Sequence, residues 1–176
     1  MMVNDHAAII WLTGLSGAGK TTLAQSFVKC CRHNGINPLL LDGDQIRDTL
    51  GQTGFDEPSR KAHNLLVGRL AALMEGQGHL VVVSMISPYA DVREEVRVLG
   101  NKYIEVFVNT PLEVCISRDI KGLYRKALDN QIQNFTGISA PYQIPENPEL
   151  VLNTTQMDPD AGAQLLWEYY QSTMIH

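Results

Sequence analysis

Short apolar runs alternate along the chain with segments in which apolar residues recur at helical spacing. The apolar runs predict five buried strands, over residues 7–12, 39–41, 80–83, 103–108 and 150–152. The helical spacing predicts five main helices, over residues 21–34, 58–77, 88–99, 111–118 and 158–172. Strands that alternate with helices form a parallel sheet covered by helices on both faces. The pattern therefore predicts an α/β fold built on five parallel strands.

Two of the predicted helices carry marked apolar side chains, and we expect those of the closing helix to pack in the core. In the helix over 58–77 these side chains form one stripe, which consists of Leu65, Leu66, Leu70, Leu73 and Met74. In the closing helix over 158–172 they are Leu165, Leu166, Trp167 and Tyr170.

Residues 119–148 interrupt the alternation of strands and helices. This segment is rich in Gly, Pro, Asn and Gln and has no clean period, which is typical of a mobile lid. No linker, low-complexity tract or internal repeat divides the chain, so we expect a single domain over 1–176. Ligands of such sheets bind at the carboxyl ends of the strands. We therefore expect the chemistry at that edge, under the lid.

The most informative motif follows the first predicted strand. Residues 14–21 read Gly-Leu-Ser-Gly-Ala-Gly-Lys-Thr, which matches the phosphate-binding pattern G-x-x-x-x-G-K-[ST]. In such a loop Lys20 reaches the β- and γ-phosphates and the Thr21 hydroxyl ligates Mg²⁺. A fortuitous glycine-rich turn is the alternative, but the strand before the motif and the helix after it favour a nucleoside triphosphate site. We therefore assign the triphosphate to Gly14, Leu15, Ser16, Gly17, Ala18, Gly19, Lys20, Thr21 and Thr22.

Two carboxylates follow the second predicted strand, near the phosphate loop if the sheet is parallel. Of Asp42 and Asp44, one can hold Mg²⁺ through water and the other can accept a hydroxyl proton. The alternative is a turn in which Asp44 caps a helix over 45–50, and the two roles can coexist. Arg47, close to the same face as Asp44, either meets an anionic substrate or is solvated. Phe55, in a glycine-rich loop, either stacks on a base or fills the core.

Cations are concentrated at two further places. Arg60 and Lys61 open the helix over 58–77, where they oppose the helix dipole, so we expect them to face something negative. The run 121–126, Lys-Gly-Leu-Tyr-Arg-Lys, puts cations into the predicted lid. Lids over phosphoryl transfer need cations to neutralise developing charge, whereas a basic surface loop is the alternative.

Composition narrows the class of protein. A net charge of −5 argues against a nucleic-acid partner, but a local cluster of cations still allows a small anionic substrate. The three cysteines are an odd number, and Cys30 and Cys31 are adjacent, so we expect reduced thiols. No apolar run approaches the length of a membrane span, and no leader sequence is recognised. We therefore expect a cytoplasmic protein with no membrane partner.

In their order along the chain, these motifs resemble the adenylylsulfate kinase (APS kinase) family. The most specific matching segments are Lys-Gly-Leu-Tyr from Lys121 and Phe-Thr-Gly-Ile from Phe135. The phosphate loop also matches, as do Leu-Leu-Asp-Gly-Asp-Gln-Ile-Arg from Leu40, Ile-Ser-Pro-Tyr from Ile86 and Ala-Pro-Tyr-Gln-Ile-Pro from Ala140. The resemblance spans nearly the whole chain and implies a P-loop kinase fold.

The resemblance also implies a reaction, which is the transfer of the γ-phosphoryl group of ATP, with Mg²⁺, to the 3′-hydroxyl of adenylyl sulfate in sulfate assimilation. It implies catalytic roles for Lys20, Asp42, Asp44, Ser87 and Lys121, and metal contacts from Thr21 and Asp42. It implies acceptor contacts from Asp44, Arg47, Phe55, Arg60, His63, Ile86, Ser87, Lys121, Gly122, Leu123 and Phe135. The resemblance further implies that Phe55 and Phe135 are the pair that sandwiches the base. A homodimer is implied as well.

Ser87 matches a serine that the family has been described as using as a phosphoserine intermediate. No base is evident beside Ser87 in the sequence. Direct in-line transfer needs only positioning and electrostatic stabilisation. We therefore expect direct transfer and a smaller effect from loss of Ser87 than from loss of Asp44.

One segment departs from the family pattern. Where members read Glu-Asn-Ile-Arg-Arg, this chain has Ala62, His63, Asn64, Leu65 and Leu66. A one-residue gap restores an asparagine, but one residue turns a side chain by about 100° around a helix. The departure motivates an alternative acceptor, another nucleotide-linked compound such as a cytidine diphosphoramidate. A third hypothesis, a nucleotide-binding regulatory protein without turnover, is disfavoured by the retained catalytic side chains.

Overall fold

The sheet is the organising element of the computed structural model, which describes residues 6–52 and 54–174. Its five strands are all parallel and lie in the order β2-β3-β1-β4-β5. They are β1 (Ala8–Thr13), β2 (Leu39–Asp42), β3 (Leu80–Ser84), β4 (Tyr103–Val108) and β5 (Leu150–Leu152). From β1 the chain continues to β2 at one edge of the sheet and comes back to β3 beside β1. It then adds β4 and β5 on the other side of β1. The predicted α/β fold with five parallel strands is confirmed.

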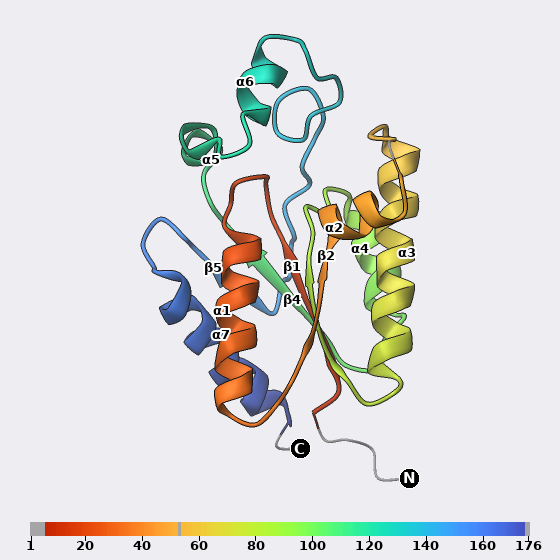
Figure 1. The fold of residues 1–176 in the computed structure, drawn as a ribbon, viewed down its shortest axis with the longest axis vertical. Helices are drawn as coiled ribbons and strands as arrows, with labels where there is room; N and C mark the ends of the chain where they lie inside the picture. Colours follow the sequence, from red (N-terminus) through yellow and green to blue (C-terminus); the bar gives the residue numbers. More distant parts are fainter. Residues whose placement is uncertain (1–5, 53, 175–176) are drawn as a thin grey trace.

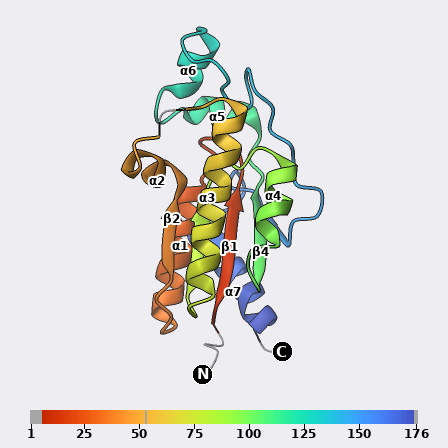
Figure 2. The same cartoon turned by 90° about the vertical axis from the view of Figure 1, so that its right-hand side faces the viewer.

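Helices cover both faces of this sheet. Figure 1 shows α1 (Lys20–His33) and α7 (Pro159–Met174) on one face, and α3 (Glu57–Glu75) and α4 (Ala90–Arg97) on the other. In Figure 2, α3 and α4 run along the sheet beside β1. No helix within residues 6–52 and 54–174 is long and apolar enough to cross a membrane.

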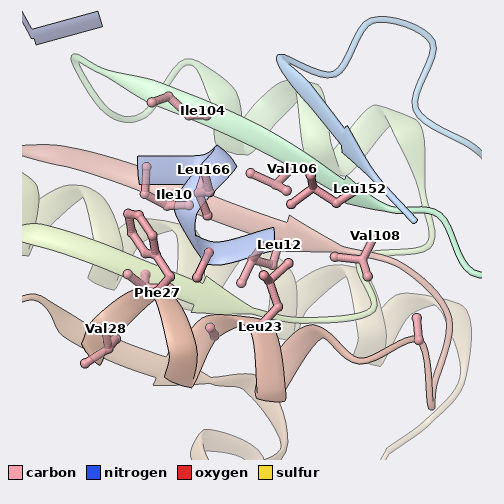
Figure 3. Packing of buried hydrophobic residues seen from close by; sticks show 14 of the residues in the cluster. Ile10, Leu12, Leu23, Phe27, Val28, Ile104, Val106, Val108, Leu152 and Leu166 are labelled. Carbon is pink, nitrogen blue, oxygen red and sulfur yellow. The ribbon is translucent and has the colours of Figure 1, made fainter. Parts of the chain in front are cut away.

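The side chains of the buried strand β1 point alternately to the two faces of the sheet and take part in two separate hydrophobic cores. Ile10 and Leu12 face α1 and α7, where they join Phe27 and Leu166 in the larger cluster, as Figure 3 shows. Ile9 and Trp11 point to the opposite face and pack with residues of α3, α4 and β3. All four β1 side chains are fully buried. Successive residues of a strand point to opposite faces, so a wholly apolar strand must be covered on both sides.

The buried face of α3 differs from the predicted stripe. Leu65, Leu66, Leu70 and Met74 are only half-buried and Leu73 is 61% exposed. The buried positions are instead Arg60, His63, Asn64, Val67, Gly68, Ala71 and Glu75. Small residues on this face let the helix approach α4 closely, since a Cβ on Gly68 would lie 2.7 Å from Val96 Cγ2. The leucines therefore lie on the flanks of the contact, where Leu65 packs against the core while only partly buried.

The closing helix and the predicted lid show two smaller differences. In α7, Leu166, Trp167 and Tyr170 are buried as predicted, but Leu165 is half-exposed and does not belong to the core. The segment over 119–148 contains a short helix, α6 (Leu123–Leu128), that the sequence pattern did not show. Six residues are too few to display a helical period. Further helices are α2 (Gly43–Thr49), directly after β2, and α5 (Leu112–Arg118), directly before the lid.

Candidate active site

A single cleft at the carboxyl edge of the sheet collects most of the predicted site residues. It has a volume of about 950 Å³ and lies between the phosphate loop, the ends of β2 and β3, the start of α3 and the lid. In Figure 1, α5 and α6 lie beyond the carboxyl ends of the strands, above this edge. Among the predicted site residues, only Gly14, Leu15, Ala18 and Gly122 do not line the cleft.

The phosphate loop has the backbone that its glycines predict. Gly14, Gly17 and Gly19 all have positive φ, and a Cβ on Gly14 would meet the carbonyl oxygen of Val108 at 2.6 Å. Lys20 opens α1 with its ammonium buried, and Nζ donates to the carbonyl oxygen of Leu15 at 2.7 Å. Burial lowers the pKa of Lys20 to about 8. A buried cation beside a glycine-rich loop at the N-terminus of a helix is suited to polyphosphate.

An oxygen cluster lies next to this loop. The Thr21 hydroxyl donates to Asp42 Oδ2 at 2.9 Å and lies 3.2 Å from Ser84 Oγ. The parallel register of β2 and β3 explains why Ser84 belongs to this cluster, because Asp42 and Ser84 are paired at the ends of these neighbouring strands. The sequence motif found Thr21 and Asp42 but did not assign Ser84, whose role depends on strand order.

These oxygens fit Mg²⁺. Mg²⁺ prefers hard oxygen ligands, keeps several waters and is usually bound by one or two protein groups together with substrate phosphates. Thr21, Asp42 and Ser84 offer two hydroxyls and one carboxylate. Within the described ranges no group of three or more His, Cys, Asp or Glu residues could hold a metal ion by itself. The site therefore suits a metal that arrives with a nucleotide.

The two carboxylates of the Asp-Gly-Asp segment have different environments. Asp42, not Asp44, is the N-cap of α2, and its Oδ1 accepts from the backbone N–H groups of Asp44 and Gln45 at 3.0 and 3.2 Å. The predicted cap at Asp44 was therefore wrong, because α2 begins two residues earlier than expected. The Asp44 carboxylate projects into the cleft, where Lys121 Nζ of the lid lies 2.7 Å from its Oδ2. Asp44, unlike Asp42, is thus not committed to capping a helix.

The side chains on the far side of the cleft include an exposed aromatic ring. Phe55 is 54% exposed and lines the cleft, so it does not fill the core. Arg47 is buried rather than solvated, and it donates to the Gly54 carbonyl oxygen at 2.6 Å with its guanidinium 4.9 Å from the centroid of Phe55. Phe135 is largely buried, with its ring in an edge contact to Tyr124 at 5.0 Å, and it lines the same cleft.

The start of α3 contributes three buried polar side chains to the cleft. Arg60 Nε donates to the Phe55 carbonyl oxygen at 2.6 Å, and its other two guanidinium nitrogens donate to the Thr136 hydroxyl and the Asn134 carbonyl oxygen. His63 Nε2 lies 2.9 Å from the Gly43 carbonyl oxygen, whereas its buried Nδ1 has no hydrogen-bond partner within the described residues. Burial and, less strongly, the charge of Arg47 lower the pKa of His63. Both effects favour the neutral form of the His63 imidazole.

The side chains of Asn64 and Ser87 belong to one continuous series of hydrogen bonds. Ser87 Oγ donates to Asn64 Oδ1 at 2.6 Å and accepts from Trp11 Nε1 at 3.0 Å. Asn64 Nδ2 in turn donates to the Arg60 carbonyl oxygen at 2.7 Å. Ser87 is buried and has a φ of 48°, a left-handed conformation that few non-glycine residues adopt. Its hydroxyl is therefore engaged in positioning the loop that carries Ile86.

Sequence reasoning missed two arginines that hold the loops of the site. Arg93 of α4 donates to the carbonyl oxygens of Ser87 and Gln143, each at 2.7 Å, and forms a buried ion pair with Glu105 at 3.0 Å. Arg118 at the end of α5 donates to the carbonyl oxygens of Gly17 and Thr154, at 3.2 and 3.1 Å. Apart from Ser87, these carbonyl partners lie far from the two arginines in the sequence, so no local spacing could have identified Arg93 and Arg118.

Comparison with known proteins agrees with this geometry. The family model described as adenylylsulphate kinase matches residues 6–153. A probable adenylyl-sulfate kinase of Pyrococcus abyssi is 46% identical over 158 residues, which are 89% of this chain and 91% of that protein. An adenylyl-sulfate kinase of Geotalea daltonii is 45% identical, over 92% of this chain and 81% of that protein. The bifunctional enzyme NodQ of Rhizobium tropici is 43% identical over 97% of this chain, which spans only 28% of NodQ.

A solved structure is similar over the same extent. The APS kinase CysC of Mycobacterium tuberculosis, in complex with AMPPNP and APS, superposes with a TM-score of 0.90. It is 38% identical in sequence, over 94% of this chain and 98% of that chain. Fold, motif order and sequence identity thus agree, and the chain belongs to the adenylylsulphate kinase family.

Proposed function

We propose that this protein transfers the γ-phosphoryl group of ATP to the 3′-hydroxyl of adenylyl sulfate, which gives 3′-phosphoadenylyl sulfate and ADP. The observation that carries the proposal is that one cleft holds the phosphate loop, the Asp44–Lys121 pair and the two rings of Phe55 and Phe135. A kinase for a nucleotide acceptor needs all three in reach of one another. Family membership identifies the acceptor as adenylyl sulfate.

The donor half of the reaction follows from the phosphate loop. Backbone N–H groups of the loop and the Lys20 ammonium hold the β- and γ-phosphates. Thr21, Asp42 and Ser84 would hold Mg²⁺, which neutralises charge on the β- and γ-phosphate oxygens when it is bound. Arg118 fixes the loop through Gly17, so the N–H groups are oriented before ATP arrives.

The acceptor half centres on Asp44. The 3′-hydroxyl oxygen forms a bond to the γ-phosphorus as the bond between that phosphorus and the β–γ bridging oxygen breaks, and ADP leaves. The hydroxyl proton passes to the Asp44 carboxylate, which is not committed to capping a helix. Lys121, released from Asp44, is placed to approach the transferring group. Ser87 takes no covalent part, because both hydrogen-bonding roles of its hydroxyl serve Trp11 and Asn64.

The base of the acceptor is bound by the aromatic side chains. Stacking on an aromatic ring is worth about 1–3 kcal/mol per base. Phe55 presents an exposed ring, and Phe135 lines the same cleft from the lid. The Arg47 guanidinium lies over the Phe55 ring and adds positive charge for an anionic acceptor.

A second acceptor, a cytidine-linked compound such as a cytidine diphosphoramidate, is favoured by one observation. His63 stands where the family has asparagine and lines the cleft, and its buried Nδ1 has no hydrogen-bond partner among the residues that the structure describes. A buried polar atom without a partner costs free energy and is satisfied by a ligand that offers the matching group. Sequence identities above 40% to adenylyl-sulfate kinases favour adenylyl sulfate over this alternative.

A panel of acceptors separates the two functions. Release of ADP is followed with ATP and Mg²⁺ in the presence of adenylyl sulfate, a cytidine-linked acceptor, or neither. We expect turnover with adenylyl sulfate at a kcat/KM at least about a hundredfold above that with the cytidine compound. Turnover of the cytidine compound with none of adenylyl sulfate rejects the proposal. ATP binding with no turnover of any acceptor supports a regulatory protein instead.

We further propose a homodimer in the cytoplasm, as the family resemblance implies. Cys30, Cys31 and Cys115 are free thiols, which fits a reducing compartment. Light scattering coupled to size-exclusion chromatography distinguishes a dimer from a monomer or a larger assembly.

A further inference from the structure

Asn64 joins helix α3 to the loop that follows β3. Its Oδ1 accepts from Ser87 Oγ at 2.6 Å, and its Nδ2 donates to the Arg60 carbonyl oxygen at 2.7 Å. Ser87 Oγ also accepts from Trp11 Nε1 at 3.0 Å. Trp11, Ser87 and Asn64 are all buried. Side chains from β1, from the loop and from α3 therefore form one buried series of hydrogen bonds.

The two ends of this series fix the direction of every hydrogen bond in it. The indole N–H of Trp11 can only donate, and the carbonyl oxygen of Arg60 can only accept. The amide NH2 of Asn64 must therefore face Arg60, which leaves the amide oxygen to accept from Ser87. The proton of the Ser87 hydroxyl then has a single position, toward Asn64. A buried series with one proton arrangement rigidifies the elements that it joins.

The same loop is also bonded to the start of the phosphate loop. The carbonyl oxygen of Ile86 accepts from Thr13 Oγ1 at 2.7 Å and from the backbone N–H of Gly14 at 3.4 Å. The next residue, Ser87, has a φ of 48°, a conformation that persists only where surrounding contacts fix it. The loop is therefore attached to the phosphate loop through a backbone carbonyl and to α3 through the Ser87 side chain.

The position of Asn64 on α3 connects this loop with the other side of the cleft. Arg60 and His63, which precede Asn64 on α3, line the same cleft as Ile86 and Ser87. In the ungapped alignment, Asn64 stands where the family pattern has isoleucine. An isoleucine side chain has no polar atom and can form neither of the two hydrogen bonds that Asn64 makes. The hydrogen bond between α3 and the loop is thus a feature of this chain's own sequence.

We propose that Asn64 is a positioning residue that, through Ser87, fixes the loop of Ile86 between the phosphate loop and α3, so that the acceptor hydroxyl lies in line with the γ-phosphate. The proposal rests on the proposed function, in which both substrates share this cleft. Misplacement of reacting groups by about 1 Å can cost about a hundredfold in rate. Loss of the Asn64 contact therefore acts on kcat more than on the binding of ATP.

The test is a double-mutant cycle between Asn64→Leu and Ser87→Ala in the full chain. Leucine keeps the branching of asparagine at Cγ but neither accepts from Ser87 nor donates to Arg60. We expect Asn64→Leu to lower kcat about fivefold to tenfold, with the KM for ATP changed less than about twofold. Adding Asn64→Leu to Ser87→Ala should lower kcat by less than about twofold further, because the hydrogen bond is already lost. Multiplication of the two single effects overturns the proposal, as does a wild-type kcat in Asn64→Leu.

A matched control separates positioning from a general loss of stability. Glu75 is buried at the other end of α3, where its carboxylate accepts from the backbone N–H groups of Asn101 and Lys102. Glu75→Gln should lower the melting temperature and leave kcat and both KM values unchanged. A fall in kcat of the same size in Glu75→Gln as in Asn64→Leu overturns the proposal.

The indole N–H resonance of Trp11 gives a readout that needs no acceptor. The chain has two tryptophans, and a Trp167→Phe variant assigns their signals in protein that carries isotope-labelled tryptophan. The Trp11 signal should shift in Asn64→Leu and in Ser87→Ala but not in Glu75→Gln, and an unshifted signal in Asn64→Leu overturns the proposal. A wild-type enzyme that turns over only a cytidine-linked acceptor rejects the proposed function instead, and the same cycle is then measured with that acceptor.

Discussion

Lys121 Nζ lies 2.7 Å from Asp44 Oδ2, so a cation of the lid contacts the carboxylate that we propose as the acceptor of the hydroxyl proton. Both side chains are mostly exposed, at 62% and 70%. Exposed ion pairs contribute little to stability, because solvent screens them. The contact can therefore break when substrates enter, which frees Asp44 for the hydroxyl and Lys121 for the transferring phosphate.

Replacement of Asp44 should abolish turnover without harming the fold. We expect Asp44→Asn to lower kcat by about a hundredfold to ten-thousandfold, the range for loss of a general base, while ATP affinity changes little. Asp48→Asn, one turn further along α2 and exposed, should retain wild-type kcat. Steady-state kinetics and ATP titration make the comparison. Equal kcat values for the two variants would contradict the role of Asp44.

Removal of the Ser87 hydroxyl should cost much less catalysis. Ser87→Ala leaves Trp11 Nε1 and Asn64 Oδ1 unpaired, so we expect a loss of about 1–3 kcal/mol in the free energy of unfolding and a fall in kcat of about tenfold or less. Incubation of the wild-type enzyme with radiolabelled ATP and no acceptor should yield no labelled protein. A labelled Ser87, or near-abolition of turnover in the variant, would restore the phosphoserine route.

ATP binding should depend on pH through Lys20. Burial lowers its pKa to about 8, so the free enzyme loses this charge as pH rises through that value, and ATP affinity falls. Stability moves in the opposite direction: the unfolded chain binds the extra proton between about pH 8 and 10.4, so this lysine makes the free energy of unfolding rise with pH there. Calorimetric titration of ATP from about pH 7 to 9.5 checks the prediction, and an affinity independent of pH would refute it.

The buried ion pair of Arg93 and Glu105 should dominate the stability of the loop that carries Ile86 and Ser87. Arg93→Met leaves the Glu105 carboxylate short of a partner and frees the carbonyl oxygens of Ser87 and Gln143. We expect a loss of about 3 kcal/mol or more in the free energy of unfolding by urea. Arg69→Met on the surface should cost about 0.5 kcal/mol or less. Similar losses for the two variants would show that the network is not structural.

Features encoded by contiguous residues could be predicted from the sequence, whereas features that depend on contacts between distant segments could not. The phosphate loop was found because its glycines, Lys20 and Thr21 are contiguous. Ser84 joins Thr21 only through the register of β2 and β3, which no local spacing reveals. The buried face of α3 depends on the close approach at Gly68, which the stripe of leucines in the sequence does not reveal.

The identity of the phosphorylated product tests the central claim most directly. The wild-type enzyme is given ATP, Mg²⁺ and equal amounts of adenylyl sulfate and a cytidine-linked acceptor, and the products are resolved by phosphorus NMR. We predict a new phosphate monoester on the 3′-oxygen of adenylyl sulfate, formed in step with ADP. A monoester on the cytidine compound with adenylyl sulfate unchanged would contradict the account.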